Sequence, residues 1–567
     1  MKNPMATWNG LPAELRGLIM DYVAIGAQEY NRSKASKGKK ASRRRGMGGY
    51  AVVCKQWQCF IEKHNFRTLE VGSARDLSRF DQIMKDPRRR SLLRRVSLRV
   101  ELPRYSKKLA KVPETDIEMD ENEVMFTRGI WNLFDILSKW TLERPEGIEL
   151  ELGAASPSDK PELFGEAGLD ENSESRFFSH ELDFSWITAG CEQVGRHGLP
   201  EVSVVSSCHI LRKNHRNFSS HALLTIFSSL PKLREIRYEP WHQIDMESQL
   251  EVDSDLARTM PFYPSHINRV SIFEHFDAFN DGAGGEEWED ADSSSSSSSD
   301  DDNDDHDDGY PDNNEDNGGD DESNTSGDES DAPIDPLDTD PFLPERTECR
   351  SLAKNLAYLS LQAEEMAVSN MADASTFFGS LLSNKTQPPV WTNLRRLTLT
   401  SHTMLSGIEP EQINKVLHLT ATAAKQMPAL KMLELYKVDQ FGAAVFRYTV
   451  DTMSTTASWE STWEFRTEER VRTAWSAVAS KNTNHELEFL PEVMLGEYRG
   501  PFIFINENLR SKDLVVHPAS LADMLAKEMN KCNACHGFCA YPKPNLPLGL
   551  TPTASTHGVV DLTGDSE

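Results

Sequence analysis

The sequence has little cysteine and no long hydrophobic run. Eight cysteines are scattered over 567 residues, too dispersed for the disulfide framework of a small secreted domain. No apolar stretch is long enough to span a bilayer, and the opening MKNPMATWNG lacks the apolar core of a signal peptide. We therefore expect an intracellular protein, in the nucleus or the cytoplasm, with no membrane partner.

The sequence also lacks the short motifs of common catalytic sites. It contains no P-loop, no dinucleotide glycine fingerprint, no nucleophile elbow and no HExxH pair. Among 16 histidines and many carboxylates, no spacing singles out an acid–base pair. We predict a protein that is not an enzyme and has no cofactor.

One cysteine cluster has ligands that zinc accepts. Cys532, Cys535, His536 and Cys539 lie together in CNACHGFC. Four ligands within eight residues leave little chain to wrap a tetrahedral ion, and no second pair follows. We predict no metal site here, and a metal-dependent enzyme stays a minor alternative that rests on this cluster alone.

Positive charge is absent from one segment. The formal net charge is −28, but 25 Asp and Glu and no Lys or Arg lie between Asp281 and Asp340, so the rest of the chain carries only −3. The segment has almost no apolar residues to offset the entropy of ordering. We predict a disordered acidic insertion over residues 281–345. Its role stays open between a solubilising linker, a phosphorylation site at Ser297 to Ser299, and attraction of basic partners.

A pattern of apolar-x-x-apolar-x-apolar returns along the chain. Its copies recur at regular intervals, 34 and 34 residues in one part and 38 and 36 in another. Each copy predicts a short strand whose alternate residues face a core, and helical stretches such as SHALLTIFSSLP and EQINKVLHLTATAAKQMP lie between copies. The copies begin at Phe66, Leu93, Leu199, Leu233, Ile267, Leu356, Leu394 and Leu430, with a degenerate one at Ile148.

Stacking of these units predicts the fold class. A strand–helix unit buries its apolar face only against neighbouring units. We predict an α/β fold that resembles an irregular leucine-rich-repeat solenoid, in two parts over residues 71–280 and 346–448; an ordinary α/β domain is the alternative. Residues 449–540 depart from the pattern, and their aromatic side chains predict core or cap positions. These include Trp459, Trp463, Phe465, Val471 and Trp475.

Two short amphipathic helices are predicted in the first seventy residues. LPAELRGLIMDYV carries one apolar stripe, and YAVVCKQWQCFIEKHNF carries a second. Leu11-Pro12 with Leu15 and Ile19, followed by Val53-Cys54-Lys55 and Trp57, resemble an F-box, and FIEKHNFRTLEV resembles the F-box proteins of filamentous fungi. The resemblance implies that residues 1–70 bind a Skp-type adaptor of a cullin–RING ubiquitin ligase. It assigns adaptor binding to Leu11, Pro12, Leu15, Ile19, Val53 and Trp57.

The two helices are separated by a basic insertion, NRSKASKGKKASRRRGMGG, which is longer than F-boxes usually carry. It holds eight Lys and Arg and no acid. A solvated surface loop and a nuclear-import signal both fit. No aromatic residues interleave the charges, so we expect no nucleic-acid partner.

The tail over residues 541–567 is predicted to be disordered and ends in VVDLTGDSE. Val559, Val560, Asp561 and Leu562 resemble a SUMO-interacting motif, which adds as a strand to the edge of a sheet while nearby acids meet a basic rim. A chance match in a tail is the alternative.

These predictions favour one function and leave one rival. The first is the substrate-recognition subunit of a Skp–cullin–F-box ubiquitin ligase, with the adaptor at the F-box and a protein substrate on the solenoid. The rival is a non-catalytic nuclear scaffold that binds SUMO-modified proteins through the tail.

Overall fold

The computed structural model describes most of the chain outside the predicted insertions and tail. By its contacts the chain divides into Met1–Asn280 with Arg346–Glu567, and a second unit Asp281–Glu345. The predicted acidic insertion, the basic insertion up to residue 46 and almost all of the tail lie outside the described residues. The described residues are 8–23, 47–106, 108–109, 112–141, 146–159, 180–187, 189–190, 198–214, 216–241, 246–274, 346–383, 388–439, 442–496, 498–534 and 560–561.

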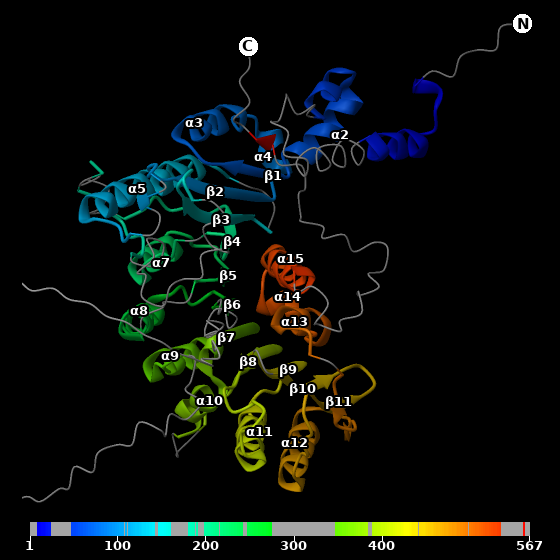
Figure 1. Cartoon of the computed structure of the whole chain (residues 1–567). Helices are drawn as coiled ribbons and strands as arrows, with labels where there is room; N and C mark the ends of the chain where they lie inside the picture. Colours follow the sequence, from blue (N-terminus) through cyan, green and yellow to red (C-terminus); the bar gives the residue numbers. More distant parts are fainter. Residues whose placement is uncertain are drawn as a thin grey trace, which may run out of the picture. The chain divides into compact units, whose positions relative to one another are not determined.

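The first unit is built on one mixed α/β sheet of fourteen strands that does not close (Figure 1). The strands are β1 Thr68–Val71, β2 Arg95–Glu101, β3 Ile148–Ala155, β4 Val205–Ile210, β5 Glu235–Tyr238, β6 Arg269–Phe273, β7 Glu365–Asp373, β8 Arg396–Thr400, β9 Met432–Val438, β10 Ala443–Val450, β11 Thr455–Ser461, β12 Leu487–Phe489, β13 Val493–Met494 and β14 Val560–Asp561. From β1 to β9 each strand pairs in parallel with the next one in the chain, whereas β10 is antiparallel to both β9 and β11.

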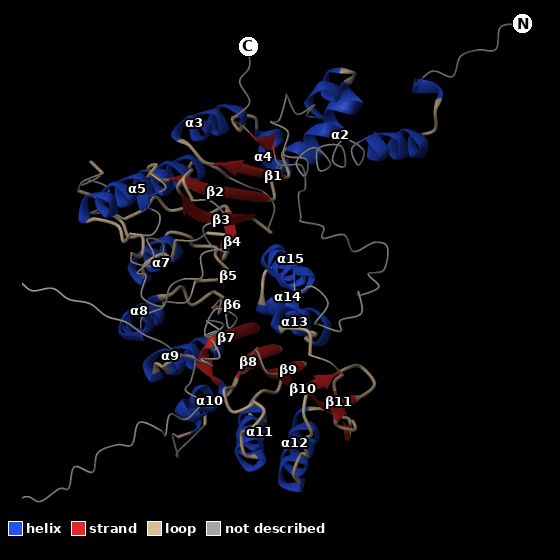
Figure 2. Ribbon diagram, viewed as in Figure 1, coloured by secondary structure: helices blue, strands red, loops and turns tan. Residues whose placement is uncertain are grey.

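Helices connect most of the strands (Figure 2). Residues 13–23 are helical. The other described helices are α2 Lys55–Asn65, α3 Ala74–Ile83, α4 Pro87–Leu92, α5 Asp116–Ser138, α7 Ser220–Ser228, α8 Met246–Thr259, α9 Arg350–Ser360, α10 Ala374–Leu382, α11 Pro410–Ala424, α12 Glu469–Asn482, α13 Pro501–Asn508, α14 Lys512–Val515 and α15 Pro518–Ala534, with short 3₁₀ turns η1 Trp8–Gly10, η2 Met47–Val52 and η5 Met260–Phe262. None of them is both long and apolar enough to cross a membrane.

Local sequence explains where several helices begin. α3 and α5 start with capping boxes, in which the Ser73 or Thr115 hydroxyl accepts from an amide three residues on and the Asp76 or Glu118 carboxylate accepts in return. α11 begins at Pro410, where a missing N–H costs nothing. These signals fix the helix starts, and packing against the sheet supplies most of the stability.

Helices cover both faces of the sheet. The connecting helices α3, α5 and α7 to α12 pack on one face and bury a continuous apolar core there. On the other face, α13 contacts β10 and α14 contacts β6 and β7. A second apolar cluster lies there, in which Leu514, Val515 and Val516 are fully buried against side chains such as Phe273 and Tyr436. Residues 498–534 therefore line the face opposite the connecting helices (Figure 1).

Most of the predicted strands are confirmed, at the copies that begin at Phe66, Leu93, Ile148, Leu233, Ile267, Leu394 and Leu430. The strand predicted at the copy that begins at Leu356 was wrong. That copy lies in α9, because Leu352, Leu356 and Leu359 follow helical spacing and all face the core. At Leu199 the strand begins only at Val205, after a loop whose apolar side chains are themselves buried.

The core positions predicted outside the repeat copies are also confirmed. Trp459, Phe465, Val471 and Trp475 are buried, and Trp463 is partly buried against the same core. In α7 and α11 the predicted apolar faces, including Leu223 and Leu417, are buried.

Candidate functional site

The N-terminal helices form a small packed unit of their own. Met20, Trp57 and Ile61 make its buried core. The Trp57 ring lies 5.4 Å from the Trp8 ring and 6.0 Å from the Tyr50 ring. Trp57 is only 8% exposed, so it fastens the helices together instead of offering its ring to a partner.

Gln56 joins the two helical segments through its side chain. Its Oε1 atom accepts from Trp8 Nε1 at 3.3 Å and from an Arg16 guanidinium nitrogen at 3.1 Å. These bonds link residues that are 40 and 48 positions apart and lie on either side of the basic insertion. The helix of residues 13–23 and α2 are therefore held to each other on either side of the basic insertion.

The same unit leaves a row of large apolar side chains exposed. Of the residues assigned to adaptor binding, Pro12, Leu15, Ile19 and Val53 are exposed and Leu11 is half-buried. The structure adds three that were not assigned. Leu18 is 64% exposed, Tyr22 80% and Val52 85%. Leu18 and Tyr22 belong to the apolar stripe of the first helix, so its periodicity was the signal that could have included them.

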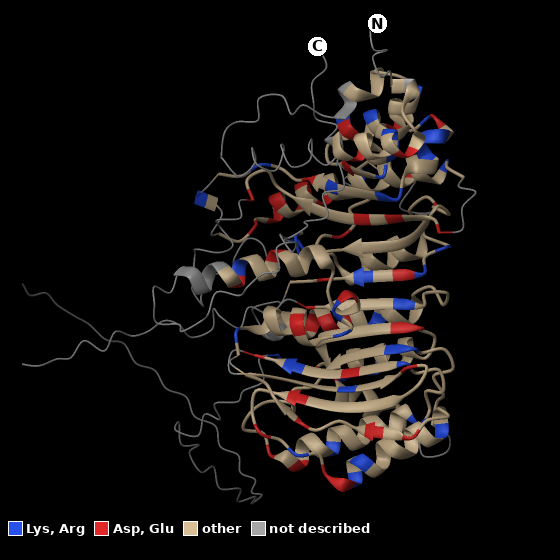
Figure 3. Cartoon of the chain, turned by 90° about the vertical axis from the view of Figure 1, so that its right-hand side faces the viewer, with Lys and Arg blue, Asp and Glu red and all other residues tan. Residues whose placement is uncertain are grey.

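A ladder of alternating charge crosses the sheet on the face opposite the connecting helices (Figure 3). Arg95 pairs with Glu149 at 2.5 Å, and Arg269 pairs with Glu365 at 3.2 Å. Every rung lies directly opposite its neighbour in the strand register, with Ser207 as the one uncharged step. In strand order the rungs are Arg95, Glu149, Ser207, Glu235, Arg269, Glu365 and Arg396.

The C-terminal segment of residues 498–534 is held to this face by polar contacts as well as by its apolar cluster. Asp513 accepts from Arg396 at 2.9 Å, and its backbone carbonyl accepts from Arg237 at 2.7 Å. The buried Glu434 carboxylate accepts hydrogen bonds from the backbone amides of Arg510 and Ser511 at 3.1 and 2.9 Å. The segment therefore neutralises charges that the strands would otherwise expose to water.

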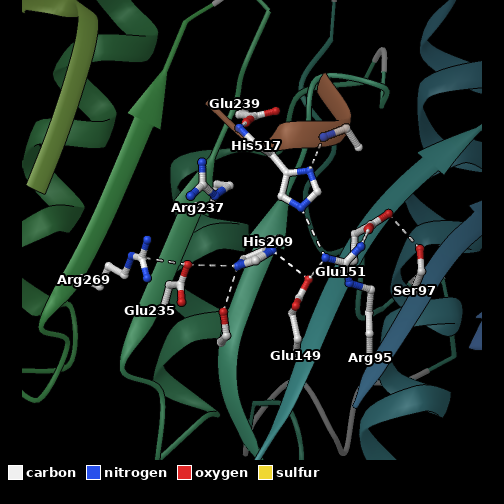
Figure 4. A network of polar contacts seen from close by, with 12 residues as sticks. Arg95, Ser97, Glu149, Glu151, His209, Glu235, Arg237, Glu239, Arg269 and His517 are labelled. Carbon is white, nitrogen blue, oxygen red and sulfur yellow. Dashed lines mark hydrogen bonds and ion pairs between the residues drawn. The ribbon is translucent and has the colours of Figure 1, made fainter. Parts of the chain in front are cut away.

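His209 lies at the centre of a polar network beside His517 of this segment (Figure 4). Its Nδ1 atom is 3.0 Å from Glu149, and its Nε2 atom is 2.8 Å from Ser207 Oγ and 3.4 Å from Glu235. Burial alone would lower the pKa of His209, but the two carboxylates outweigh it and raise the pKa. Although burial opposes ionisation of Glu149, His209 and Arg95 lower the pKa of that carboxyl to about 2.

His517 faces this network from the C-terminal segment (Figure 4). Its Nε2 atom lies 3.2 Å from an Arg95 nitrogen, and its backbone amide donates to Glu239 at 2.6 Å. Burial and the neighbouring His209, Arg237 and Arg95 lower the pKa of His517 to about 2. The imidazole is therefore neutral across the physiological range.

Glu149, His209 and His517 are the one group of potential metal ligands among the described residues, with ligand atoms within 4.8 Å of one another. The Arg95 guanidinium occupies the cation position in this group, at 2.5 Å from Glu149 and 3.2 Å from His517. The residues present do not fit a metal ion, because the ion would have to displace an ion-paired arginine. Of the predicted zinc cluster, Cys532 lies in α15, and Cys535, His536 and Cys539 lie outside the described residues.

Sequence reasoning missed this network. Its members come from β2, β3, β4 and β5 and from a segment more than 270 residues further on, so no local spacing brings them together. The signal that was present is the third position of four repeat copies, which supplies ladder charges; these are Arg95, Glu235, Arg269 and Arg396.

Comparison with known proteins bears on the C-terminal half. Residues 319–517 match a family of unknown function, DUF6546. The match covers about a third of the chain and does not reach the N-terminal helices. No curated protein matches the chain.

Proposed function

We propose that this chain is the substrate-recognition subunit of a Skp–cullin–F-box ubiquitin ligase and that residues 1–70 are its F-box. The exposed apolar row on the N-terminal helices carries the proposal. Leu15, Leu18, Ile19 and Tyr22 follow i, i+3, i+4 and i+7 spacing and are all exposed. A helix that leaves such a stripe in water is suited to docking in an apolar groove of a partner.

The strand–helix units fit the second part of this proposal, an irregular leucine-rich-repeat-like solenoid behind the F-box. Parallel pairing in chain order from β1 to β9, with helices on one face, supports it. The chain would supply binding and proximity, and a separate enzyme would supply catalysis. The nucleus or the cytoplasm is the compartment that this function requires.

The substrate surface in this proposal is the β1 and β2 end of the sheet. Residues 498–534 already cover the face over β6, β7 and β10. At the other end, Glu70, Arg99 and Glu101 are exposed strand residues. We assign the protein substrate to that end because it lies next to the adaptor-binding helices in sequence and carries these exposed strand residues.

Co-purification with a Skp-type adaptor tests the proposal. The full chain with Leu11→Ala and Pro12→Ala should lose at least tenfold of the bound adaptor, and Leu18→Ser with Tyr22→Ser should do the same. Phe262→Ala is the matched control, because Phe262 is equally apolar and 71% exposed but lies on η5. Adaptor recovery that is unchanged in both double variants would contradict the F-box assignment.

A second candidate, a nuclear scaffold that binds SUMO-modified proteins, is favoured by one observation. Val560–Asp561 adopt a strand, the conformation that a SUMO-interacting motif takes when bound. Titration of a peptide covering His557 to Glu567 into labelled SUMO tests it. Replacing Val559, Val560 and Leu562 with Ala should remove most of the affinity. The absence of saturable binding below millimolar peptide would eliminate this candidate.

A further inference from the structure

The edge of the sheet at β1 is occupied by a strand from the tail. β14 runs parallel to β1, with Leu69 opposite Val560 and Glu70 opposite Asp561. In the described sheet β14 is the outermost strand on this side. Without it, β1 would present a row of unpaired amides and carbonyls, which is the usual template for strand addition.

The backbone of β1 shows which groups face that edge. The Arg67 carbonyl accepts from the amides of Arg94 and Arg95 at 2.8 and 3.1 Å, so Arg67 faces β2. Backbone groups of successive residues in a parallel strand point to opposite sides. Leu69 therefore faces β2, and the amide and carbonyl of Thr68 and Glu70 face the tail.

The tail sequence points to the same behaviour independently. Its VVDL run resembles a motif that binds by adding as a strand, and the structure pairs two residues of that run with a strand of the same chain. We propose that the β1 edge is a docking site for an extended strand and that the chain's own tail, through Val560–Asp561, is its occupant.

Tethering makes such a short contact effective. The tail strand is joined to the end of α15 by 25 residues, which can span up to about 80 Å when extended. A segment tethered on this scale has a local concentration on the order of millimolar. A strand contact that is weak between separate molecules is then populated within one chain.

The consequence is competition for the tail. A backbone paired to β1 cannot simultaneously pair with the sheet of another protein. The inference thus extends the second candidate function by adding a self-binding state, but the docking itself needs no SUMO.

Hydrogen exchange of the tail amides in the full chain tests the docking. Glu70→Pro removes the amide that faces the tail, while the Glu70 side chain is exposed and the preceding residue stays extended. Glu70→Ala keeps the amide and is the matched control. The tail should exchange at least several-fold faster in Glu70→Pro than in the wild type, and Glu70→Ala should match the wild type.

Equal tail exchange in the wild type and Glu70→Pro would overturn the proposal. So would protection that rises with protein concentration, because the occupant would then be the tail of a second copy. If Glu70→Pro does not fold, Val560→Pro breaks the pairing from the other strand, and faster exchange of the Glu70 amide becomes the expected result.

A second measurement separates this proposal from SUMO binding. If the tail binds SUMO, Glu70→Pro should raise the SUMO affinity of the full chain toward that of the free peptide. If neither chain nor peptide binds SUMO, the scaffold function fails and the exchange result still decides the docking.

Discussion

Arg346 and Glu274 form a buried ion pair, with 2.6 Å between Arg346 Nε and Glu274 Oε2, across 72 positions of sequence. Arg346 also donates to Asp253 at 2.6 Å, and all three side chains are almost completely buried. Glu274 follows β6 and Arg346 precedes α9, so the pair closes the chain on either side of the predicted acidic insertion.

Breaking this pair should destabilise the protein strongly. Arg346→Met removes the guanidinium that pairs with the buried Asp253 and Glu274 carboxylates, a change that typically costs about 3–5 kcal/mol. Urea unfolding of the full chain should show the loss. Arg350→Met is the control, because Arg350 is exposed and its removal should change stability by no more than about 0.5 kcal/mol. A loss below about 1 kcal/mol in Arg346→Met would mean that the pair contributes little.

Deleting the insertion itself should have little effect. Removing Gly282 to Ser330 takes away almost no apolar area and leaves both Glu274 and Arg346 in place. The melting temperature should stay within a few degrees of the wild type in a calorimetric scan. A cooperative loss of folding on deletion would show that these residues belong to the packed structure.

Acid should weaken the attachment of the C-terminal segment through His517. The folded-state pKa of about 2 lies below the ordinary 6.5, so the unfolded chain binds the proton more readily. Stability is therefore complete above pH 6.5 and is lost as the pH falls, by at most about 1.4 kcal/mol per pH unit. Chemical unfolding at pH 7 and pH 5 should show a smaller loss in His517→Gln than in the wild type.

The control for this prediction is His418→Gln, because His418 is exposed on α11. It should keep the pH dependence of the wild type. His209 acts in the opposite direction, since its raised pKa adds stability below pH 6.5 that is lost as the pH rises. If His517→Gln loses as much stability as the wild type on acidification, the buried neutral His517 does not cause the acid-induced loss of stability.

Glu181 should limit stability at neutral pH. Burial, with help from Asp183 and Asp253, raises the pKa of its carboxyl to about 8. The folded chain holds the proton that the unfolded chain releases near pH 4.5, so stability declines as the pH rises from about 4.5 to 8. Glu181→Gln, which mimics the protonated form, should be more stable at pH 7.5 by about 1–3 kcal/mol.

The advantage of Glu181→Gln should shrink at pH 5, because that pH lies only about half a unit above the value of 4.5 near which the unfolded chain releases the proton. Glu201→Gln is the matched control, because Glu201 is exposed and should show no gain. A Glu181→Gln chain no more stable than the wild type at pH 7.5 would contradict the raised pKa. Urea unfolding at the two pH values measures both effects.

Local pattern predicted much of the sheet. LRRVSL and LRRLTL became β2 and β8 because alternating apolar residues suit a strand with one face on a helix layer. The same letters failed at LAYLSL, since Leu352 extends the pattern to helical spacing and the residues form α9. A six-residue window could not separate the two periods, whereas a window of eleven residues would have done so.

The polar network was beyond sequence reasoning for a different reason. Arg95 meets His517 at a separation of 422 positions, and Arg237 meets Asp513 at 276. Such pairs depend on the path by which the chain returns across the sheet, and no local signal encodes that path. The placement of Trp57 inside the helical pair, instead of on its surface, depends in the same way on Trp8 and Tyr50 closing over it.

Residues 498–534 return across the sheet. The chain therefore makes contacts of two very different sequence separations. Strand pairs from β1 to β9 join consecutive units, so they can form one after another as the chain leaves the ribosome. The contacts of Asp513 and His517 form only when almost the whole sheet exists, because they link distant positions. Contacts of long sequence separation are slow to form. During synthesis the charged face of β2 to β8 thus remains hydrated until the last segment emerges, and the apolar patch around Phe273 and Tyr436 is the surface that a chaperone would meet in that interval.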